Sequence, residues 1–294
     1  MSDDNAERTS EKPAFDRAVE DVGNILQLEH VNLTVPDQGI AALFYVTGLG
    51  FTRDPYIDFG TFNMWVNLGE PRFHLPKAGA RRFRGHVMVV GASLEDLNQR
   101  LKFSAKPMSG SKFDWREADD HIALTCPWGN DIRAYEPGVC GDMALGMPEV
   151  CVDVPEGTSE GICRFYQQVM NCPANHAGTE TRVKVGYNQH LVFSETSDVS
   201  GYDGHHIAVY VADFSGPHRW LAERQLITEE SDQHQYRFQT IVDPDTGETL
   251  TELEHEVRSL AHAMFHRPLV NRNPAVNFFT YQKGNEIFTP GSNT

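Results

Sequence analysis

The sequence contains no run that approaches about 18 apolar residues, so we expect no membrane-spanning helix. It is also poor in basic residues, because 25 Lys and Arg stand against 41 Asp and Glu, giving a formal net charge of −16. Nucleic acids and anionic membranes need a basic surface, so we expect neither as a partner. Cysteine is scarce, with five residues and no C-x-x-C pair. That odd number predicts reduced thiols in the cytoplasm rather than a disulfide framework.

What the chain does contain is an internal repeat, with an offset of about 120 residues. Four landmarks return in the same order: 28–36 as 147–155, the Phe-Tyr pair 44–45 as 165–166, 85–90 as 205–210, and the turn 126–130 as 243–247. Solenoid units run about 20–50 residues, so a repeat of this length indicates a duplicated domain.

The repeat divides the chain into five segments. We expect a polar N-terminal tail over 1–24, a first domain over 25–138, a linker over 139–146, a second domain over 147–257, and a C-terminal extension over 258–294 that packs on the domains. In each copy a strand leads into a helix and then into several short strands with tight turns. For the first helix, Asp37 is the expected N-terminal cap. This pattern predicts an α+β fold with largely antiparallel sheets.

The run LEHVNLTVPD…FYVTGLGF resembles the opening of a vicinal oxygen chelate module, the superfamily of glyoxalase I, bleomycin-resistance proteins and extradiol dioxygenases. Residues 202–210 resemble its fifth strand, and 243–247 with Glu252 and Leu253 resemble its last turn and metal-binding strand. The resemblance covers roughly 26–256. It implies tandem domains, each made of two β-α-β-β-β units that form a cupped sheet around a divalent metal. Ligands are implied on the first, fifth and eighth strands, sometimes with another on the fourth.

The first and fifth strands offer four implied ligands: His30, Glu149, His86 and His206. On the eighth strand the first copy has Arg133, whose guanidinium has no lone pair for a metal. In the second copy a strict count from the turn glycine reaches Thr251. The turn has one extra residue, however, and the next position is Glu252. The choice is consequential, because a slip of one residue turns the side chain to the other face of a strand.

Two pairings of these positions remain open. If each copy keeps its own cup, the sets are His30/His86/Arg133 and Glu149/His206/Glu252. If the copies exchange halves, as the superfamily also does, the sets are His30/His206/Glu252 and Glu149/His86/Arg133. We prefer the exchange because it gives one complete 2-His-1-carboxylate metal site and one abandoned site. Such a triad suits Fe(II) and oxygen chemistry, with Zn, Ni, Co and Mn as alternatives.

Four further residues are candidates for catalysis under the resemblance. His74, on the fourth strand of the first copy, would face the exchanged cup as a proton shuttle or an additional ligand. Its counterpart His190 has a spacing to His206 that resembles the acid–base histidine of extradiol dioxygenases, which favours the unexchanged pairing. His234 and Tyr236 resemble the outer His or Tyr of such sites.

The resemblance implies an Fe(II)-dependent dioxygenase of the extradiol, ring-cleaving type, acting with O₂ on a catechol- or hydroquinone-like small molecule. Thr240 stands where the extradiol tyrosine is expected, which departs from a strict catechol-cleaving pattern. One alternative is a glyoxalase- or epimerase-like isomerase or lyase with Zn, Ni or Co. Another is a metal-free protein that binds a small ligand, as resistance proteins of this fold do. We expect association into a homo-oligomer.

Overall fold

The computed structural model describes residues 15–58, 60–91, 93–271, 273, 276–277 and 280–284. Sheet 1 has the order β14-β15-β16-β13-β1-β4-β3-β2. Its strands are β1 (Ile25–Asn32), β2 (Thr52–Asp58), β3 (Asn63–Asn67), β4 (Arg72–Pro76), β13 (His206–Val211), β14 (Ile227–Asp232), β15 (Gln235–Val242) and β16 (Thr249–Ser259). Sheet 2 has the order β10-β11-β12-β9-β5-β8-β7-β6. Its strands are β5 (Gly85–Val90), β6 (Asp114–Glu117), β7 (His121–Thr125), β8 (Asp131–Tyr135), β9 (Glu149–Pro155), β10 (Ala174–Ala177), β11 (Glu180–Gly186) and β12 (Gln189–Thr196).

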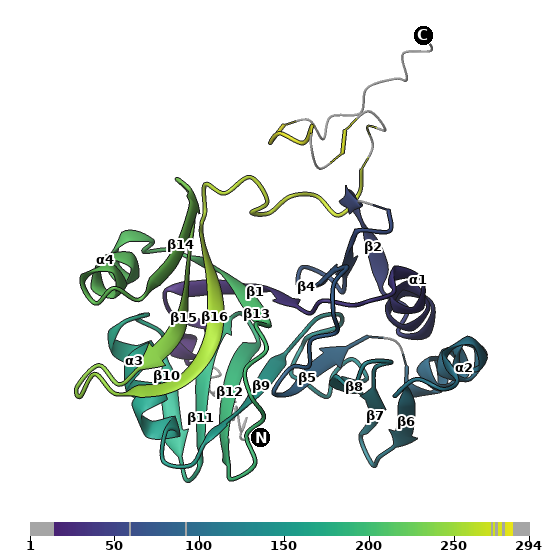
Figure 1. Cartoon of the computed structure of the whole chain (residues 1–294), viewed down its shortest axis with the longest axis horizontal. Coiled ribbons are helices and arrows are strands. Elements are labelled where there is room, and N and C mark those ends of the chain that lie inside the picture. The colour runs from purple at the N-terminus through teal and green to yellow at the C-terminus, as the bar shows by residue number, and fades with distance from the viewer. Residues whose placement is uncertain are drawn as a thin grey trace, which may run out of the picture.

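Each sheet joins one half of each sequence copy. Sheet 1 takes β1–β4 from the first copy and β13–β16 from the second, whereas sheet 2 takes β5–β8 and β9–β12. The halves meet through antiparallel pairs, β1 with β13 and β5 with β9. In Figure 1, most of sheet 1 lies in the upper part of the view and sheet 2 lies in the lower part. The expected α+β fold of duplicated units is confirmed, and the halves are exchanged between the copies.

Helices cover the outer flanks of the sheets (Figure 1). They are α1 (Gln38–Ala41), continued by the π-helix η2 (Ala42–Gly48), α2 (Leu94–Ala105), continued by the 3-10 helix η3 (Lys106–Met108), α3 (Ser159–Gln168) and α4 (Ser215–Glu223). Asp37 caps α1 as predicted, because its Oδ1 accepts from the Ile40 backbone N–H at 2.9 Å. Phe44 and Phe165, equivalent in the two copies, are both fully buried in one continuous apolar core that spans both sheets.

Gly85 lies where the two copies join in sheet 2. Its φ is +116°, a region that L-residues with a side chain rarely adopt. A Cβ there would stand 2.1 Å from the carbonyl oxygen of Cys151 on β9. The glycine therefore permits β5 and β9 to pair closely immediately before His86.

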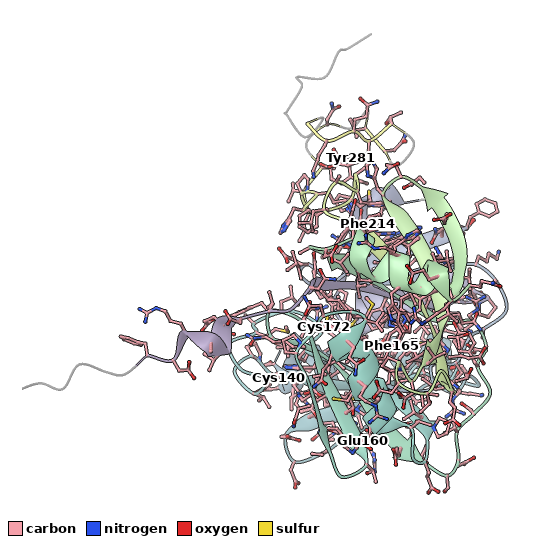
Figure 2. The ribbon with its side chains drawn as sticks, turned by 90° about the vertical axis from the view of Figure 1, so that its left-hand side faces the viewer. Cys140, Glu160, Phe165, Cys172, Phe214 and Tyr281 are labelled. Atoms are coloured by element: carbon pink, nitrogen blue, oxygen red, sulfur yellow. The ribbon has the colours of Figure 1, made fainter. Side chains whose placement is uncertain are left out.

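Both ends of the described chain leave the sheets. The 3-10 helix η1 (Arg17–Glu20) stands away from the body in Figure 2, and the rest of the expected tail, 1–14, lies outside the described residues. After β16 the C-terminal segment crosses sheet 1 toward β2, and Tyr281 lies in it (Figures 1 and 2). Within the described ranges, no helix has the length and apolarity needed to cross a membrane.

The buried His255 on β16 should make the folding stability of the protein sensitive to acid. It is fully buried, Nδ1–H donates to the Leu253 carbonyl at 2.7 Å, and Nε2 accepts from the Tyr166 hydroxyl at 2.7 Å. Burial lowers its pKa from 6.5 to about 4. The unfolded chain thus binds more protons between these values, so stability should hold above pH 6.5 and fall as the pH drops toward 4, by up to about 3 kcal/mol. Chemical denaturation across this range should show the loss, and His255→Leu should reduce its slope. An unchanged slope in the variant would assign the loss to other groups.

Candidate metal centre

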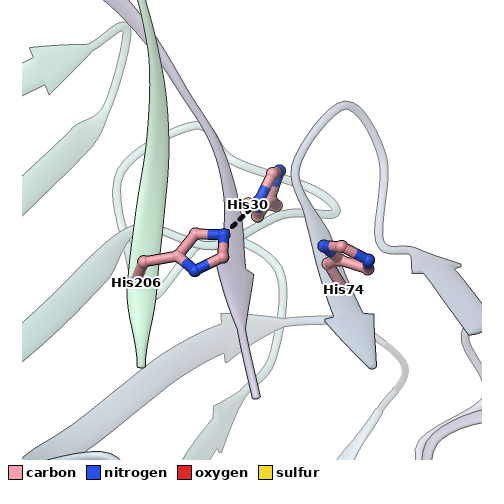
Figure 3. Close-up of side chains that lie close together, drawn as sticks. All are labelled: His30, His74 and His206. Carbon is pink, nitrogen blue, oxygen red and sulfur yellow. Dashed lines mark hydrogen bonds between the residues drawn. The ribbon is translucent and has the colours of Figure 1, made fainter. Parts of the chain in front are cut away.

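Three histidines meet on the cup face of sheet 1. His30 is on β1, His74 on the neighbouring β4 and His206 on the other neighbour, β13. Asn32 of β1 is in register with His206 on one side and with His74 on the other, which brings both to one level of the sheet. One ligand nitrogen from each ring lies within 4.8 Å of the other two, and the Nε2 atoms of His30 and His206 are 3.5 Å apart (Figure 3).

Each ring has a polar neighbour at Nδ1. The Nδ1–H of His30 donates to the carboxylate of Glu29, and Nδ1 of His206 lies 3.4 Å from Oε1 of Glu254. Nδ1 of His74 lies 2.7 Å from the side-chain amide of Asn32. In metal sites such partners fix the ring and its tautomer, leaving the lone pair of Nε2 for the ion.

The contact between Asn32 and His74 joins the side-chain amide to Nδ1 of the ring. Asn32 Oδ1 and His74 Nε2 are both buried without a hydrogen-bond partner among the described residues. A side-chain amide can present either its oxygen or its nitrogen to a neighbour. Turning the amide lets Oδ1 accept from Nδ1–H of His74, and its Nε2 then keeps a lone pair with no partner except a ligand.

A buried charge network surrounds the three rings. Glu29 is fully buried and forms ion pairs with Arg72 and Arg258, while Glu256 pairs with Arg258 and Arg237. Burial opposes ionisation of Glu29, but the charges of Arg72, His30 and Arg258 outweigh it and hold its pKa well below the usual range. Glu29 is therefore an anion that orients His30.

The other two rings are held neutral. Burial, followed by the charge of His30, lowers the pKa of His74 and of His206 well below 6.5. A neutral imidazole is the form that binds a metal, and a set of three histidines suits a divalent first-row ion. Glu256 adds a carboxylate oxygen 3.6 Å from Nε2 of His206. The donor set therefore fits a divalent metal.

The sequence matches no family model and no curated protein. Among solved structures, the fold is similar to that of a "putative dioxygenase" from Bacillus subtilis, with a TM-score of 0.56 and 15% identity over 83% of this chain and 88% of that one. It is similar to glyoxalase I from Zea mays, with a TM-score of 0.55 and 14% identity over 79% of this chain and 92% of that one. The chain has the tandem vicinal oxygen chelate fold. At these identities the likeness establishes the fold alone.

The second cup of this vicinal oxygen chelate fold is on sheet 2. It brings together His86 on β5, Arg133 on β8 and Glu149 on β9, as the exchanged pairing predicts. Glu149 forms an ion pair with Arg182. Burial and then the charge of Arg133 lower the pKa of His86 to about 4. Among the described residues, His30, His74 and His206 form the one group of three or more His, Cys, Asp or Glu side chains that lie close enough to share a metal ion.

Glu252, the sequence-predicted carboxylate ligand, is not beside the histidines. Its carboxylate accepts from Nε2 of Gln239 at 2.7 Å. On β16 the residue in register with His206 is Glu254, and the carboxylate beside Nε2 of His206 belongs to Glu256. The β15–β16 ladder explains the difference, because Phe238 pairs with His255 but Thr240 pairs with Glu252. The extra residue on β16 is a bulge, so strict alternation does not connect Glu252 with the other two glutamates.

Three other candidates lie away from the cluster. His190 is on β12 of sheet 2, paired with Lys184 and Glu149. His234 is in the turn between β14 and β15, where its backbone carbonyl accepts from Ser259 N–H. Tyr236 is buried against the rings of Phe214 and His218 of the α4 region, and burial raises its pKa. These contacts place Tyr236 on the helix-covered side of β15, whereas its neighbour Arg237 contacts Glu256.

The sequence did not single out Glu29, although it directly precedes His30. Neighbours on a regular strand point to opposite faces. Here Leu28 pairs with Val209 but His30 pairs with Ala208, so Glu29 is the extra residue of a bulge. Both side chains can then reach the same side of β1. The only signal in the sequence was a charged residue within an apolar strand.

A cavity of about 360 Å³ adjoins the cluster through His74. Sheet 1 supplies Ile57, Asn63, Trp65, His74, Gln235 and Arg258 to its lining. The C-terminal extension supplies His262, Ala263, Met264 and Tyr281. Trp65 stacks on His74 with ring centroids 4.0 Å apart, which fixes the ring between the cluster and the cavity. A substrate in this cavity would reach the candidate metal centre.

Proposed function

We propose that this chain is a metal-dependent dioxygenase that uses Fe(II) and O₂ on a small aromatic substrate with vicinal oxygens, such as a catechol. The proposal is supported by one observation above the rest: three imidazoles converge, and each has a polar neighbour at Nδ1. His30, His74 and His206 would hold the ion, with Glu256 as an adjacent carboxylate. Bound Fe(II) would supply the Lewis acidity and redox chemistry for a reaction with O₂.

The chain's own residues would prepare the site in two ways. The bulge at Glu29 and the pair Trp65 and Asn32 fix the rings of His30 and His74, so the donors are oriented before any ion binds. His74 alone of the three lines the cavity, so it is also the group placed to exchange a proton with a bound substrate.

The isomerase alternative requires a carboxylate that moves a proton. The three carboxylates beside the histidines are each paired with an arginine: Glu29 with Arg72, Glu254 with Arg237 and Glu256 with Arg258. For Glu256, burial raises the pKa, but Arg258, His30 and Arg237 together lower it below the ordinary value. A carboxylate held in its anionic form by arginines is a weak base, which favours the dioxygenase proposal.

The test is the metal content of protein purified anaerobically without chelators, followed by O₂ uptake with catechol. We expect about one iron per chain after reconstitution, and O₂ consumption that depends on both iron and catechol. Zinc, nickel or cobalt at that stoichiometry, without O₂ uptake, would favour an isomerase or lyase. A well-folded protein that binds no metal would contradict both the dioxygenase and the isomerase or lyase hypotheses. The remaining hypothesis would then be a metal-free protein that binds a small ligand.

A further inference from the structure

The cavity beside His74 has a roof that belongs to the C-terminal extension. His262, Ala263, Met264 and Tyr281 form that side of it, although they lie beyond the last strand of sheet 1. Met264 and Tyr281 pack with the β2 and β3 residues Tyr56, Ile57 and Trp65 in a small apolar cluster separate from the main core. The extension therefore forms part of the cavity wall.

The roof is fixed by a buried ion pair. Arg267 and Asp54 on β2 are both fully buried, and the guanidinium meets both carboxylate oxygens, with Nη1 2.7 Å from Oδ1. Nearby, the Tyr56 hydroxyl donates to the Val270 carbonyl at 3.1 Å and the Asn271 amide donates to the Pro55 carbonyl at 3.3 Å. These contacts hold the extension against β2, so the shape of the cavity is largely set before a ligand enters.

Apart from Nε2 of His74, two buried polar atoms of the lining have no hydrogen-bond partner among the described residues. They are the indole Nε1–H of Trp65 and the amide Oδ1 of Asn63, two residues apart on β3. Indole nitrogen is only a donor and amide oxygen only an acceptor. One hydroxyl group of a ligand can satisfy both, accepting from Trp65 and donating to Asn63. Buried groups of this kind are costly when unpaired, so they select a ligand that pairs them.

The lining offers little to a charged ligand. Of the lining residues that the structure describes, Arg258 is the only Arg, Lys, Asp or Glu. Its guanidinium is already paired with Glu256 and Glu29. A carboxylate or phosphate on the ligand would therefore lose water without gaining a cation among these residues.

We propose that the cavity binds a neutral, flat aromatic compound that carries a hydroxyl group remote from its chelating oxygens, received by Trp65 and Asn63 under the roof of the C-terminal extension. Placing the chelating end of the ligand at the histidine cluster rests on the proposed function. The contacts of its remote hydroxyl group with Trp65 and Asn63 do not depend on that function. The substrate class thereby narrows from catechols in general to uncharged catechols with a further hydroxyl-bearing substituent.

The experiment compares three probes by anaerobic titration calorimetry of zinc-loaded protein: catechol, 4-(hydroxymethyl)catechol and 3,4-dihydroxybenzoate. We expect the hydroxymethyl compound to bind about tenfold more tightly than catechol, since it gains two hydrogen bonds, and the benzoate to bind more weakly than catechol. Trp65→Phe should remove the tenfold preference, measured as the ratio of the affinities of the two neutral probes for the same variant. The matched control Trp115→Phe, on β6 of sheet 2, should keep the tenfold preference. Asn63→Ala is a second variant, expected to reduce the preference.

Equal binding of the two neutral probes by the natural protein, or a preference for the benzoate, would overturn the proposal. So would a Trp65→Phe protein that keeps the tenfold preference. If the protein binds no zinc, the proposed function fails separately. In that case 3-hydroxybenzyl alcohol is titrated into metal-free protein. Quenching of tryptophan fluorescence that disappears in Trp65→Phe supports the cavity assignment, and no binding overturns it.

Discussion

Replacing Glu29 with alanine is expected to lower the free energy of unfolding by about 3–5 kcal/mol, because it leaves Arg72 and Arg258 buried without their shared anion. The same change removes the acceptor of the His30 Nδ1–H, which should weaken metal binding roughly 10–100-fold. Urea denaturation gives the first quantity and competition with a chromophoric zinc chelator gives the second.

The matched control for this variant is Glu252→Ala. Its carboxylate contacts Gln239, and burial is incomplete, so we expect a loss of less than about 1 kcal/mol and unchanged metal affinity. A protein that loses its metal on Glu252→Ala but keeps it on Glu29→Ala would restore the assignment of Glu252 as a ligand and contradict the network described around Glu29.

His206→Ala is expected to abolish stoichiometric metal binding and all metal-dependent activity. The change removes one of three converging imidazoles from a buried site, so its effect should exceed the roughly 10–100-fold loss typical of outer partners. Metal analysis after dialysis of the reconstituted variant, with circular dichroism to verify folding, measures the result.

His190→Ala provides the comparison for His206→Ala. It removes a histidine of the same sequence copy, the counterpart of His74, which lies on β12 of sheet 2. Metal content should be unchanged, because the described contacts of His190 are with residues of sheet 2. Loss of metal in this variant and not in His206→Ala would mean that the site lies on sheet 2.

The fold was accessible from the sequence because it depends on patterns that survive local variation. Repeated landmarks and alternating apolar residues predicted both β-α-β-β-β pairs, and Asp37 predicted the start of α1. Even the exchange of halves could be preferred on chemical grounds, since only that pairing brings His30 and His206 to one sheet. These inferences need only the identity of residues and an approximate position along a strand.

The finer contacts of the site were not accessible in the same way, because two β-bulges decide them. One bulge places Glu29 beside His30, where regular alternation would point them apart. The other shifts β16 against β15, so counting from the turn reaches Thr251, or Glu252 when its extra residue is allowed for, while Glu256 lies beside His206. A bulge changes the face of every later residue, and nothing in the composition of these strands marks where it occurs.

The exchange of halves also sets the order in which the protein can assemble during synthesis. All strands of sheet 2 lie in one continuous stretch, 85–196, whereas sheet 1 is made from 25–76 and 206–259. His30 leaves the ribosome 176 residues before His206, an interval of roughly 9–35 seconds at ordinary rates of translation. Throughout that interval β1 lacks its partner β13. The last strand of sheet 2 ends at Thr196, whereas the last strand of sheet 1 ends at Ser259. A nascent chain can therefore complete the cup on sheet 2 first, and the three histidines of sheet 1 can meet only after β13 has been synthesised.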